Sequence, residues 1–308
     1  MKHFHLLPVF ALLCVFIRGS NAILPAELYW ESMLPNTPLP NALQELLEPA
    51  EAAGNRSSFS ESELQAGNQG GRRVTYGVGY WAESKSFKKN DTFNTTTIYF
   101  LNKDLVSGKK MNLVFTKSTN GSNFLPHEIA KIIPFSSKRL PEILKHFSIK
   151  PMSKEAEIMK QTIIECEAPG ITGEDKNCAI SLESLVDYVI AKFGKNVEVF
   201  TNEAKEENVK QEYTILKGIK MMGDKQIVCH KERYAYAVFY CHRIMNTNVY
   251  MIPLVGADGS KAKALVVCHL DTSAWNPKHF AFQVLNVKPG GPPVCHFLNS
   301  DTIVWVPN

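Results

Sequence analysis

The sequence predicts an α+β domain with a mostly antiparallel sheet and a few helices, preceded by a flexible N-terminal arm. Two observations support this prediction. Short runs rich in valine and aromatic residues, which are typical of strands, dominate the chain after residue 194. Residues 50–72 are instead rich in Gly, Ser, Glu, Gln and Asn and contain few apolar residues, which is typical of a linker.

The first 22 residues have the pattern of a secretory signal peptide. Lys2 supplies positive charge, the run from Leu6 to Ile17 is apolar, and Ser20-Asn21-Ala22 forms a cleavage site of small residues. A buried helix is the alternative interpretation of the apolar run. No later run is long enough to span a membrane. We therefore expect a secreted protein without a membrane span, and the net charge of +4 gives no reason to expect a nucleic-acid partner.

Residues 23–96 are predicted to form an N-terminal arm and linker, partly disordered. Its prolines, from Pro35 to Pro40, favour an extended chain. Asn41 is expected to cap a short helix, with Gln44 three residues later. Four sequons that fit glycosylation on an extracellular surface begin at Asn55, Asn90, Asn94 and Asn120.

One stretch of the arm differs from its polar surroundings. Residues 74–81 hold three aromatic residues and two glycines, the aromatic residues being Tyr76, Tyr80 and Trp81. One interpretation is a short strand or turn that covers the folded domain. The other is a substrate-like peptide displayed on a flexible arm.

The folded domain is predicted to cover residues 97–308. Helices are expected between residues 140 and 164, with Pro141 and Ser153 near their starts. The strongest helix signal is the 3.6-residue apolar period from Leu182 to Phe193, followed by Gly194 as a stop. Asp258-Gly259 predicts a hairpin turn between two strands. Further strands are expected at 98–100, 111–115 and around each of four Cys-His dipeptides.

These four Cys-His dipeptides are the most informative feature of the chain. Ten residues separate the first from the second, and twenty-five residues separate each later pair of neighbours. Trp305 follows the last of them after eight residues and is expected to anchor the core. The dipeptides are Cys229-His230, Cys241-His242, Cys268-His269 and Cys295-His296.

Neighbouring residues on a strand point to opposite faces of the sheet. Four such strands could therefore gather four sulfurs in one layer and four imidazoles in another, and imidazoles suit a metal ion. The alternative is that each histidine only packs or caps the end of its strand. Asp271 could orient a neighbouring imidazole, although a surface position is favoured. His127, His146 and His279 lie outside the dipeptides and are expected not to be ligands.

Six cysteines lie after residue 165, and secretion places them in an oxidising compartment. We expect Cys166 and Cys178, which flank a loop containing Gly and Pro, to form a disulfide bond. The pairing among Cys229, Cys241, Cys268 and Cys295 stays open. A four-cysteine zinc site is the competing use, but it lacks the usual pair of cysteines two to four residues apart.

In the spacing of its Cys-His dipeptides and Trp305, the chain resembles plant BURP-domain proteins. Cys166 and Cys178 match the extra cysteine pair of that family. Residues 100–105 resemble the opening of its domain, with Tyr99-Phe100 where Phe-Phe is usual. Tyr29-Trp30 and residues 34–38 resemble the segment that follows the signal peptide in many members.

The sequence contains no Ser-His-Asp, P-loop or dinucleotide-binding pattern, so an ordinary hydrolase or nucleotide enzyme is not expected. The resemblance instead implies two classes of function. The first is a secreted, non-enzymatic protein of the cell wall, seed or stress response, located in the apoplast, cell wall or vacuole, with cell-wall polysaccharide as a partner. The second is a copper-dependent peptide cyclase that acts on its own N-terminal peptide, joining Tyr76, Tyr80 or Trp81. In both, the implied copper ligands are His230, His242, His269 and His296.

Overall fold

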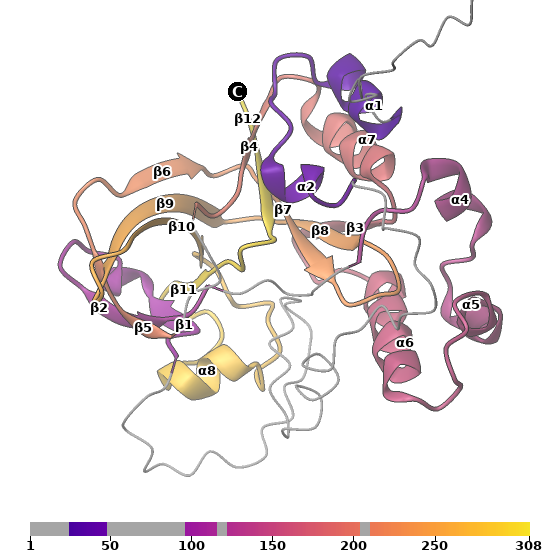
Figure 1. Cartoon of the computed structure of the whole chain (residues 1–308). Coiled ribbons are helices and arrows are strands. Elements are labelled where there is room, and N and C mark those ends of the chain that lie inside the picture. The colour runs from indigo at the N-terminus through magenta and orange to yellow at the C-terminus, as the bar shows by residue number, and fades with distance from the viewer. Residues whose placement is uncertain (1–24, 48–95, 116–121, 204–209) are drawn as a thin grey trace, which may run out of the picture.

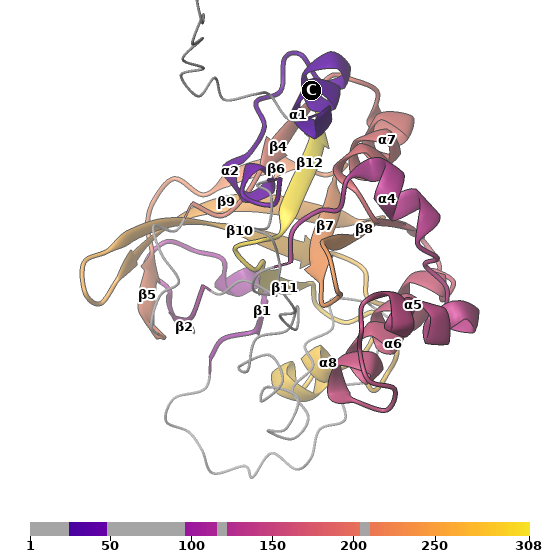
Figure 2. The ribbon, with the colours of Figure 1, turned by 45° about the vertical axis from the view of Figure 1, so that its right-hand side comes forward.

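The structure is a computed structural model that describes residues 25–47, 96–115, 122–203 and 210–308. Two antiparallel sheets pack face to face in this part of the chain, and helices cover the outer side of one of them (Figures 1 and 2). No helix within these ranges is both long and apolar enough to cross a membrane. The mixed, mostly antiparallel fold predicted from the sequence is confirmed.

The first sheet has seven strands in the order β1-β11-β10-β9-β5-β2, with β6 paired to β9. It curves strongly, so that its ends approach each other (Figure 1). The backbone N–H of Thr97, just before β1, donates to the carbonyl of Asn112 on β2 at 2.7 Å. The strands are β1 (Tyr99–Leu101), β2 (Lys110–Leu113), β5 (Gln211–Ile215), β6 (Lys220–Gly223), β9 (Thr247–Gly256), β10 (Lys261–His269) and β11 (Val294–Phe297).

The second sheet has five strands in the order β3-β8-β7-β12-β4. The neighbouring interior strands β7 and β8 are buried along almost their whole length, as the apolar run before Cys241 predicted. The strands are β3 (Glu174–Ala179), β4 (Val197–Phe200), β7 (Ile227–Glu232), β8 (Val238–Ile244) and β12 (Ile303–Pro307).

The helices lie mainly on the outer side of the five-stranded sheet, whereas α8 lies below the curved sheet (Figure 1). They are α1 (Pro25–Met33), α2 (Asn41–Gln44), α4 (His127–Ile132), α5 (Leu140–His146), α6 (Lys154–Glu167), α7 (Leu182–Phe193) and α8 (Phe280–Leu285), with short 3₁₀ turns η1 (Asn102–Asp104) and η2 (Ser137–Arg139). The predicted starts at Pro141 and Ser153 are confirmed, and Ser153 accepts a hydrogen bond from the N–H of Ala156.

Helix α7 has the bounds that the apolar period predicted. Leu182, Leu185, Val186 and Val189 are buried, and the chain leaves the helix at Gly194 with a φ of 76°. A positive φ is a conformation that glycine adopts without steric cost, which explains the stop at this position. The predicted Asp258-Gly259 turn is also confirmed, since it connects β9 to β10.

The apolar side chains form separate layers because residues alternate along each strand. On β10, the side chains of Ala264 and Val266 point into the curved sheet, whereas those of Leu265 and Val267 face the other sheet. Val228 of β7 and Val304 of β12 meet them from the five-stranded sheet. The layer between the sheets is therefore a closed apolar contact, and it is in this layer that the site described below lies.

Residues 25–47 pack on the five-stranded sheet and are part of the core. Trp30 is 1% exposed, and its ring centroid lies 5.4 Å from that of Trp305, which is fully buried as predicted. The indole N–H of Trp30 donates to the carbonyl of Thr37 at 2.7 Å. The hydroxyl of Thr37 in turn donates to the carbonyl of Val197 on β4. With the hydrogen bond from the Thr37 N–H to the Leu34 carbonyl, these contacts hold residues 34–37 in a turn where an extended chain was expected. Helix α1 before this turn was not predicted.

One detail of this segment differs from the prediction. Asn41 is the first residue of α2, Pro40 occupies the cap position, and no side chain caps the helix. The fixed φ of Pro40 and the packing of fully buried Leu43 position this single turn. Tertiary contact therefore takes the place of the expected capping interaction.

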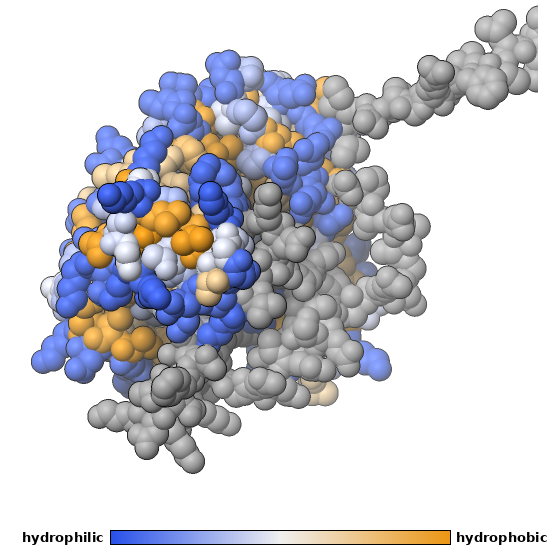
Figure 3. All heavy atoms as spheres, turned by 60° about the vertical axis from the view of Figure 1, so that its left-hand side comes forward, coloured by the Kyte–Doolittle hydropathy of each residue, from blue (hydrophilic) through white to orange (hydrophobic). Residues whose placement is uncertain are grey.

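The surface on the side of the curved sheet is mixed in polarity. Figure 3 shows apolar groups on this face separated by polar side chains. Met221 of β6, for example, is 48% exposed. Scattered apolar exposure of this kind is ordinary for a folded protein surface and gives no evidence for an interaction site.

Replacing Trp30 should show that the N-terminal segment is part of the fold. The variant W30A should lower the free energy of unfolding by about 3–5 kcal/mol, because it removes a buried indole and its contact with Trp305. Urea denaturation of the purified protein measures the loss. L28A is the matched control in the same helix, because Leu28 is 51% exposed. Equal stability of W30A and L28A would contradict this assignment.

Candidate metal centre

The cysteines of the Cys-His dipeptides form disulfide bonds across neighbouring strands. Cys229 on β7 lies directly opposite Cys241 on β8, and Cys268 on β10 directly opposite Cys295 on β11. Both pairs are bonded. A third bond joins Cys166 of α6 to Cys178 of β3, the pairing favoured from the sequence. Disulfide formation, rather than a four-cysteine zinc site, is therefore what these sulfurs do in the structure.

The register of each disulfide determines where the following histidines lie. In antiparallel strands, residues that follow two opposed cysteines are diagonal neighbours on the other face of the sheet. His230 accordingly lies opposite Tyr240 and diagonal to His242. Likewise His296 lies opposite Val267 and diagonal to His269. Each sheet thus presents one diagonal pair of imidazoles on the face away from its disulfide.

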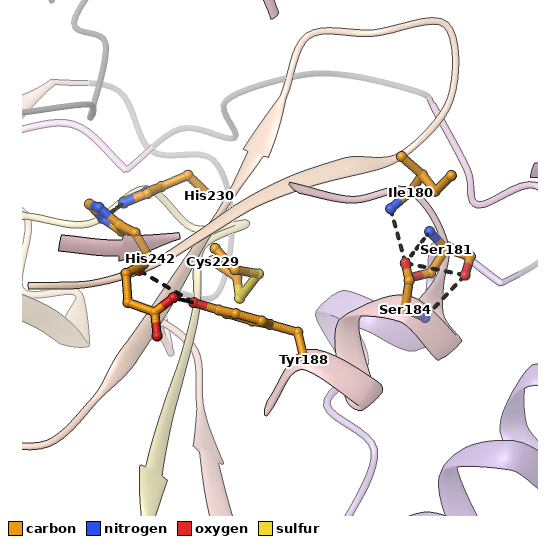
Figure 4. The surroundings of a disulfide bond; sticks show 9 residues. Ile180, Ser181, Ser184, Tyr188, Cys229, His230 and His242 are labelled. Carbon is orange, nitrogen blue, oxygen red and sulfur yellow. Dashed lines mark hydrogen bonds between the residues drawn. A yellow bond between two sulfur atoms is a disulfide. The ribbon is translucent and has the colours of Figure 1, made fainter. Parts of the chain in front are cut away.

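The two diagonal pairs face each other between the sheets. All four imidazoles line one small cavity of about 10 Å³, which is about the least space that holds one water molecule. Figure 4 shows His230 and His242 together on the side of their strands away from Tyr188 and Ser184 of α7, with Cys229 toward that helix. The side chains that complete the cavity wall are Gln226, Val228, Ile244, Thr247, Val267 and Leu298.

The sulfurs do not share one layer, so that part of the prediction is wrong. Cys229 and Cys241 lie in the core beneath α7, and Cys268 and Cys295 lie inside the curved sheet. The reason is that the dipeptides belong to two sheets packed face to face. Residues that point inward from both sheets meet, and residues that point outward from them are separated by the full thickness of the molecule.

The imidazoles are close to one another but differ in orientation. The Nε2 atoms of His230 and His242 are 3.3 Å apart. The rings of His269 and His296 are stacked, with centroids 5.6 Å apart and planes inclined by 20°. In the described ranges, no three His, Cys, Asp or Glu side chains form a finished metal-coordination group. The rings would have to turn to bind one ion together.

Hydrogen bonds hold the Nδ1 atoms of three of these rings. His242 Nδ1 donates to a carboxylate oxygen of Glu174 at 2.8 Å, and His296 Nδ1 to the carbonyl of Phe297 at 3.2 Å. His269 Nδ1 lies 3.1 Å from the hydroxyl of Thr247. A ring that donates through Nδ1 keeps a lone pair on Nε2, and this is the usual arrangement of metal-binding histidines.

Burial keeps three of the imidazoles, those of His230, His269 and His296, neutral. The pKa values of His230 and His269 are well below 6.5, first because burial disfavours the charged ring and then because other imidazoles are near. Burial also lowers the pKa of His296 to about 4, although its hydrogen bond to Phe297 acts in the opposite direction. Neutral imidazoles are the form that binds metal ions. The donor set therefore fits a metal such as copper(II), which favours imidazole nitrogen.

The carboxylate beside the site is one that sequence reasoning missed. Asp271, the residue considered for this role, is exposed and accepts a hydrogen bond from the N–H of Ser273, so the favoured surface position is confirmed. Glu174 lies far from every Cys-His dipeptide in the sequence. Only the pairing of β3 with β8 brings it to His242, and no local pattern could have revealed it.

A cluster of aromatic side chains adjoins the histidines of the curved sheet. The ring centroids of Trp275 and His269 are 4.8 Å apart, and those of Tyr99 and His296 are 5.8 Å apart. His279 contacts Trp275, but its Nδ1 accepts the N–H of Ala281 and caps α8. Neutral His279 therefore carries its proton on Nε2, which distinguishes it from His242 and His296, whose Nδ1 atoms donate.

Other residues singled out in the sequence lie elsewhere. His127 contacts Ser181 and Glu183 at the start of α7, and His146 is exposed at the end of α5. The aromatic residues Tyr76, Tyr80 and Trp81 lie outside the described residues. So do residues 1–22 and the four sequon asparagines, Asn55, Asn90, Asn94 and Asn120.

Comparison with known proteins agrees with this architecture. Residues 98–307 match the family model of the BURP domain. The chain is 50% identical over 215 residues to BURP domain protein RD22 of Arabidopsis thaliana, covering 68% of this chain and 55% of RD22. It is 41% identical over 296 residues to BURP domain-containing protein 5 of Oryza sativa subsp. japonica, covering 93% and 88%.

A wheat relative extends the comparison. The chain is 31% identical over 334 residues to Protein RAFTIN 1B of Triticum aestivum, covering 94% of this chain and 92% of the relative. The chain spans only about half the length of RD22, the first of these relatives. The three disulfide bonds and these relatives are consistent with a secretory protein.

The metal-free protein should lose stability as the pH falls from about 6.5 toward 4. Below pH 6.5 the unfolded chain binds protons on histidines that stay neutral in the folded state, so the free energy of unfolding falls. With a folded pKa of about 4 for His296, its share of the loss at pH 4 is about 3 kcal/mol. Urea denaturation at pH 7, 5 and 4 tests this.

The variant H296Q should lose correspondingly less stability over this pH range than the wild-type protein. H146Q, which changes an exposed histidine, should lose as much as the wild type. An equal loss in the wild type and in H296Q would contradict the assigned burial of His296.

Proposed function

Because the chain belongs to the BURP-domain family, we propose that it is a secreted plant protein whose four Cys-His motifs form one copper-binding site between its two sheets. The observation that carries the proposal is the shared cavity. His230, His242, His269 and His296 come from four strands of two sheets, yet all four line it. Packing alone does not require four imidazoles in one small space.

The surroundings of the four rings support binding of a metal ion. Each of the four side chains is at most 8% exposed, so the protein shields the site from bulk water. Three rings are each held by a hydrogen bond at Nδ1, and the partners are Glu174, Thr247 and the Phe297 carbonyl. The two disulfides fix the strands from which the rings project. Bound copper would supply one-electron oxidation chemistry with dioxygen.

A role without catalysis in the cell wall, in seeds or in the stress response is the broader form of the proposal. In that role the metal site stabilises the folded protein, and cell-wall polysaccharide is the proposed partner. The relatives named above are plant proteins with the same domain, which supports the family context. The location then proposed is the apoplast, the cell wall or the vacuole.

The second candidate is copper-dependent cyclisation of the chain's own arm. The described chain resumes at residue 96, and the ring of Tyr99 already lies 5.8 Å from that of His296. Trp81 precedes Thr97 by 16 residues, a length that can extend to about 55 Å at most. Tyr76, Tyr80 and Trp81 are thus tethered within reach of the site, and tethering raises their effective concentration to about the millimolar range.

Copper binding should depend on all four histidines. The purified wild-type protein should bind one Cu(II) ion with an electron paramagnetic resonance spectrum of nitrogen ligands. Alanine at position 230, 242, 269 or 296 should weaken binding by at least about tenfold, because it removes one donor from the set. Isothermal titration calorimetry measures the affinity.

The variant H146A is the matched control, because it removes an exposed imidazole that does not line the cavity. It should bind copper like the wild type. A wild-type protein that binds no copper, or four histidine variants that bind it as tightly as H146A does, would contradict the proposed site.

If the chain is a cyclase, copper and oxygen should change the mass of the peptide that holds Tyr76, Tyr80 and Trp81. Each crosslink removes two hydrogens, so the mass should fall by about 2 Da per crosslink. Peptide mass spectrometry measures the change, and Y80F and W81F identify the ring that reacts. Copper-loaded protein with four intact histidines and unmodified residues 74–81 would exclude cyclisation and leave the non-catalytic role.

A further inference from the structure

We propose that Glu174 is the positioning residue of the site, holding His242 in the Nδ1–H tautomer with the lone pair of Nε2 toward the other imidazoles. The tautomer follows from contacts in the metal-free protein. Its consequence for copper rests on the proposed function. Nothing in the spacing of the Cys-His dipeptides indicates this residue, which lies 55 residues before the first of them.

The contacts of Glu174 assign the direction of its hydrogen bonds. The side chain is 3% exposed, and one of its oxygens receives the N–H of Ile171 at 3.1 Å. The other oxygen receives the hydroxyl of Tyr240 at 2.9 Å and His242 Nδ1 at 2.8 Å. An ionised carboxylate can only accept hydrogen bonds, so His242 donates through Nδ1, and the neutral form of the ring then keeps its lone pair on Nε2.

The three donors keep this carboxylate ionised despite its position inside the protein. Hydrogen bonds from His242, Ile171 and Tyr240 all stabilise the charged form of the carboxylate and offset the cost of burying it. The contact at Nε2 of His242 agrees with a proton on its Nδ1. His230 Nε2 lies 3.3 Å from the bare Nε2 of His242 and can donate to it.

The fold holds Glu174 firmly in this place. It is the first residue of β3, opposite Ile244 of β8 and therefore diagonal to His242 on the same face. Its backbone N–H donates to the carbonyl of Ile171, which closes a turn before the strand. Just before that turn Gly170 packs tightly, since a Cβ atom there would lie 3.0 Å from the carbonyl oxygen of Glu174. The Cys166–Cys178 disulfide ties the same strand to α6.

Glu174 also makes His242 chemically different from the other rings. The Nδ1 partner of His269 is a hydroxyl and that of His296 is a backbone carbonyl. A carboxylate partner makes an imidazole a stronger donor than a neutral partner does. We therefore infer that His242 is the ring on which copper affinity depends most.

The first part of the test uses metal-free protein labelled with ¹⁵N at histidine. Nuclear magnetic resonance of the ring nitrogens reports the tautomer. His242 should be the Nδ1–H form in the wild type and in E174Q, since the glutamine carbonyl can still accept. It should become a mixture of tautomers in E174A. The matched control is D175N, since neighbouring Asp175 points to the other face and contacts Tyr188 and Lys192.

The second part measures Cu(II) affinity by titration calorimetry, with copper sulfate as the probe. E174A should bind about 10–100-fold more weakly, E174Q should show a smaller loss, and D175N should match the wild type. The electron paramagnetic resonance spectrum should change in E174A, which loss of stability alone would not produce.

The two proposals can fail separately. An unchanged His242 tautomer in E174A, or E174A copper affinity and spectrum equal to those of D175N, would overturn the role of Glu174 and leave the copper site standing. A wild-type protein that binds no copper, with a tautomer that still depends on Glu174, would overturn the proposed function and leave the positioning role intact.

Discussion

Direct opposition of two cysteines in neighbouring antiparallel strands is the constraint on which the rest of this site depends. When Cys229 lies opposite Cys241, the register of β7 and β8 is fixed, and each following histidine must point to the other face. The same holds for Cys268 and Cys295 on β10 and β11. A shift of one residue would turn every imidazole into the opposite layer, so the disulfides stabilise the strands and the placement of the rings at once.

The packing of the two sheets converts these local pairs into one cluster. Each sheet alone presents two imidazoles on a diagonal, and two rings make a weak site. The valine and leucine side chains of β7, β9, β10 and β12 form the contact between the sheets and bring the two diagonals together. Because this apolar layer excludes water, it also lowers the pKa values of His230, His269 and His296. One layer therefore supplies both position and protonation state.

Elements distant in the sequence then complete the structure on either side. Trp30 and Leu43 from the N-terminal segment cover the outer face of the five-stranded sheet next to Trp305. Strand β3 adds the edge that carries Glu174 to His242. Both contacts join residues more than 60 positions apart. The supports of the histidine cluster are thus spread over most of the described chain, although the histidines themselves lie within its last third.

The sequence by itself determined the features that depend on neighbouring residues. The apolar period of residues 182–193 predicted a helix with the right bounds, the Asp258-Gly259 pair predicted its hairpin, and the alternation in each Cys-His dipeptide predicted that sulfur and imidazole separate. These predictions succeed because helix period, turn conformation and strand pleat are set within a few residues. The expected cap at Asn41 failed because packing of Leu43, rather than local hydrogen bonding, holds that turn. Only the tertiary structure decided which cysteines pair among the four, that the sulfurs occupy two layers, and that Glu174 rather than Asp271 meets an imidazole. These facts depend on strand order and sheet packing, which join residues by long-range contacts that no local pattern encodes.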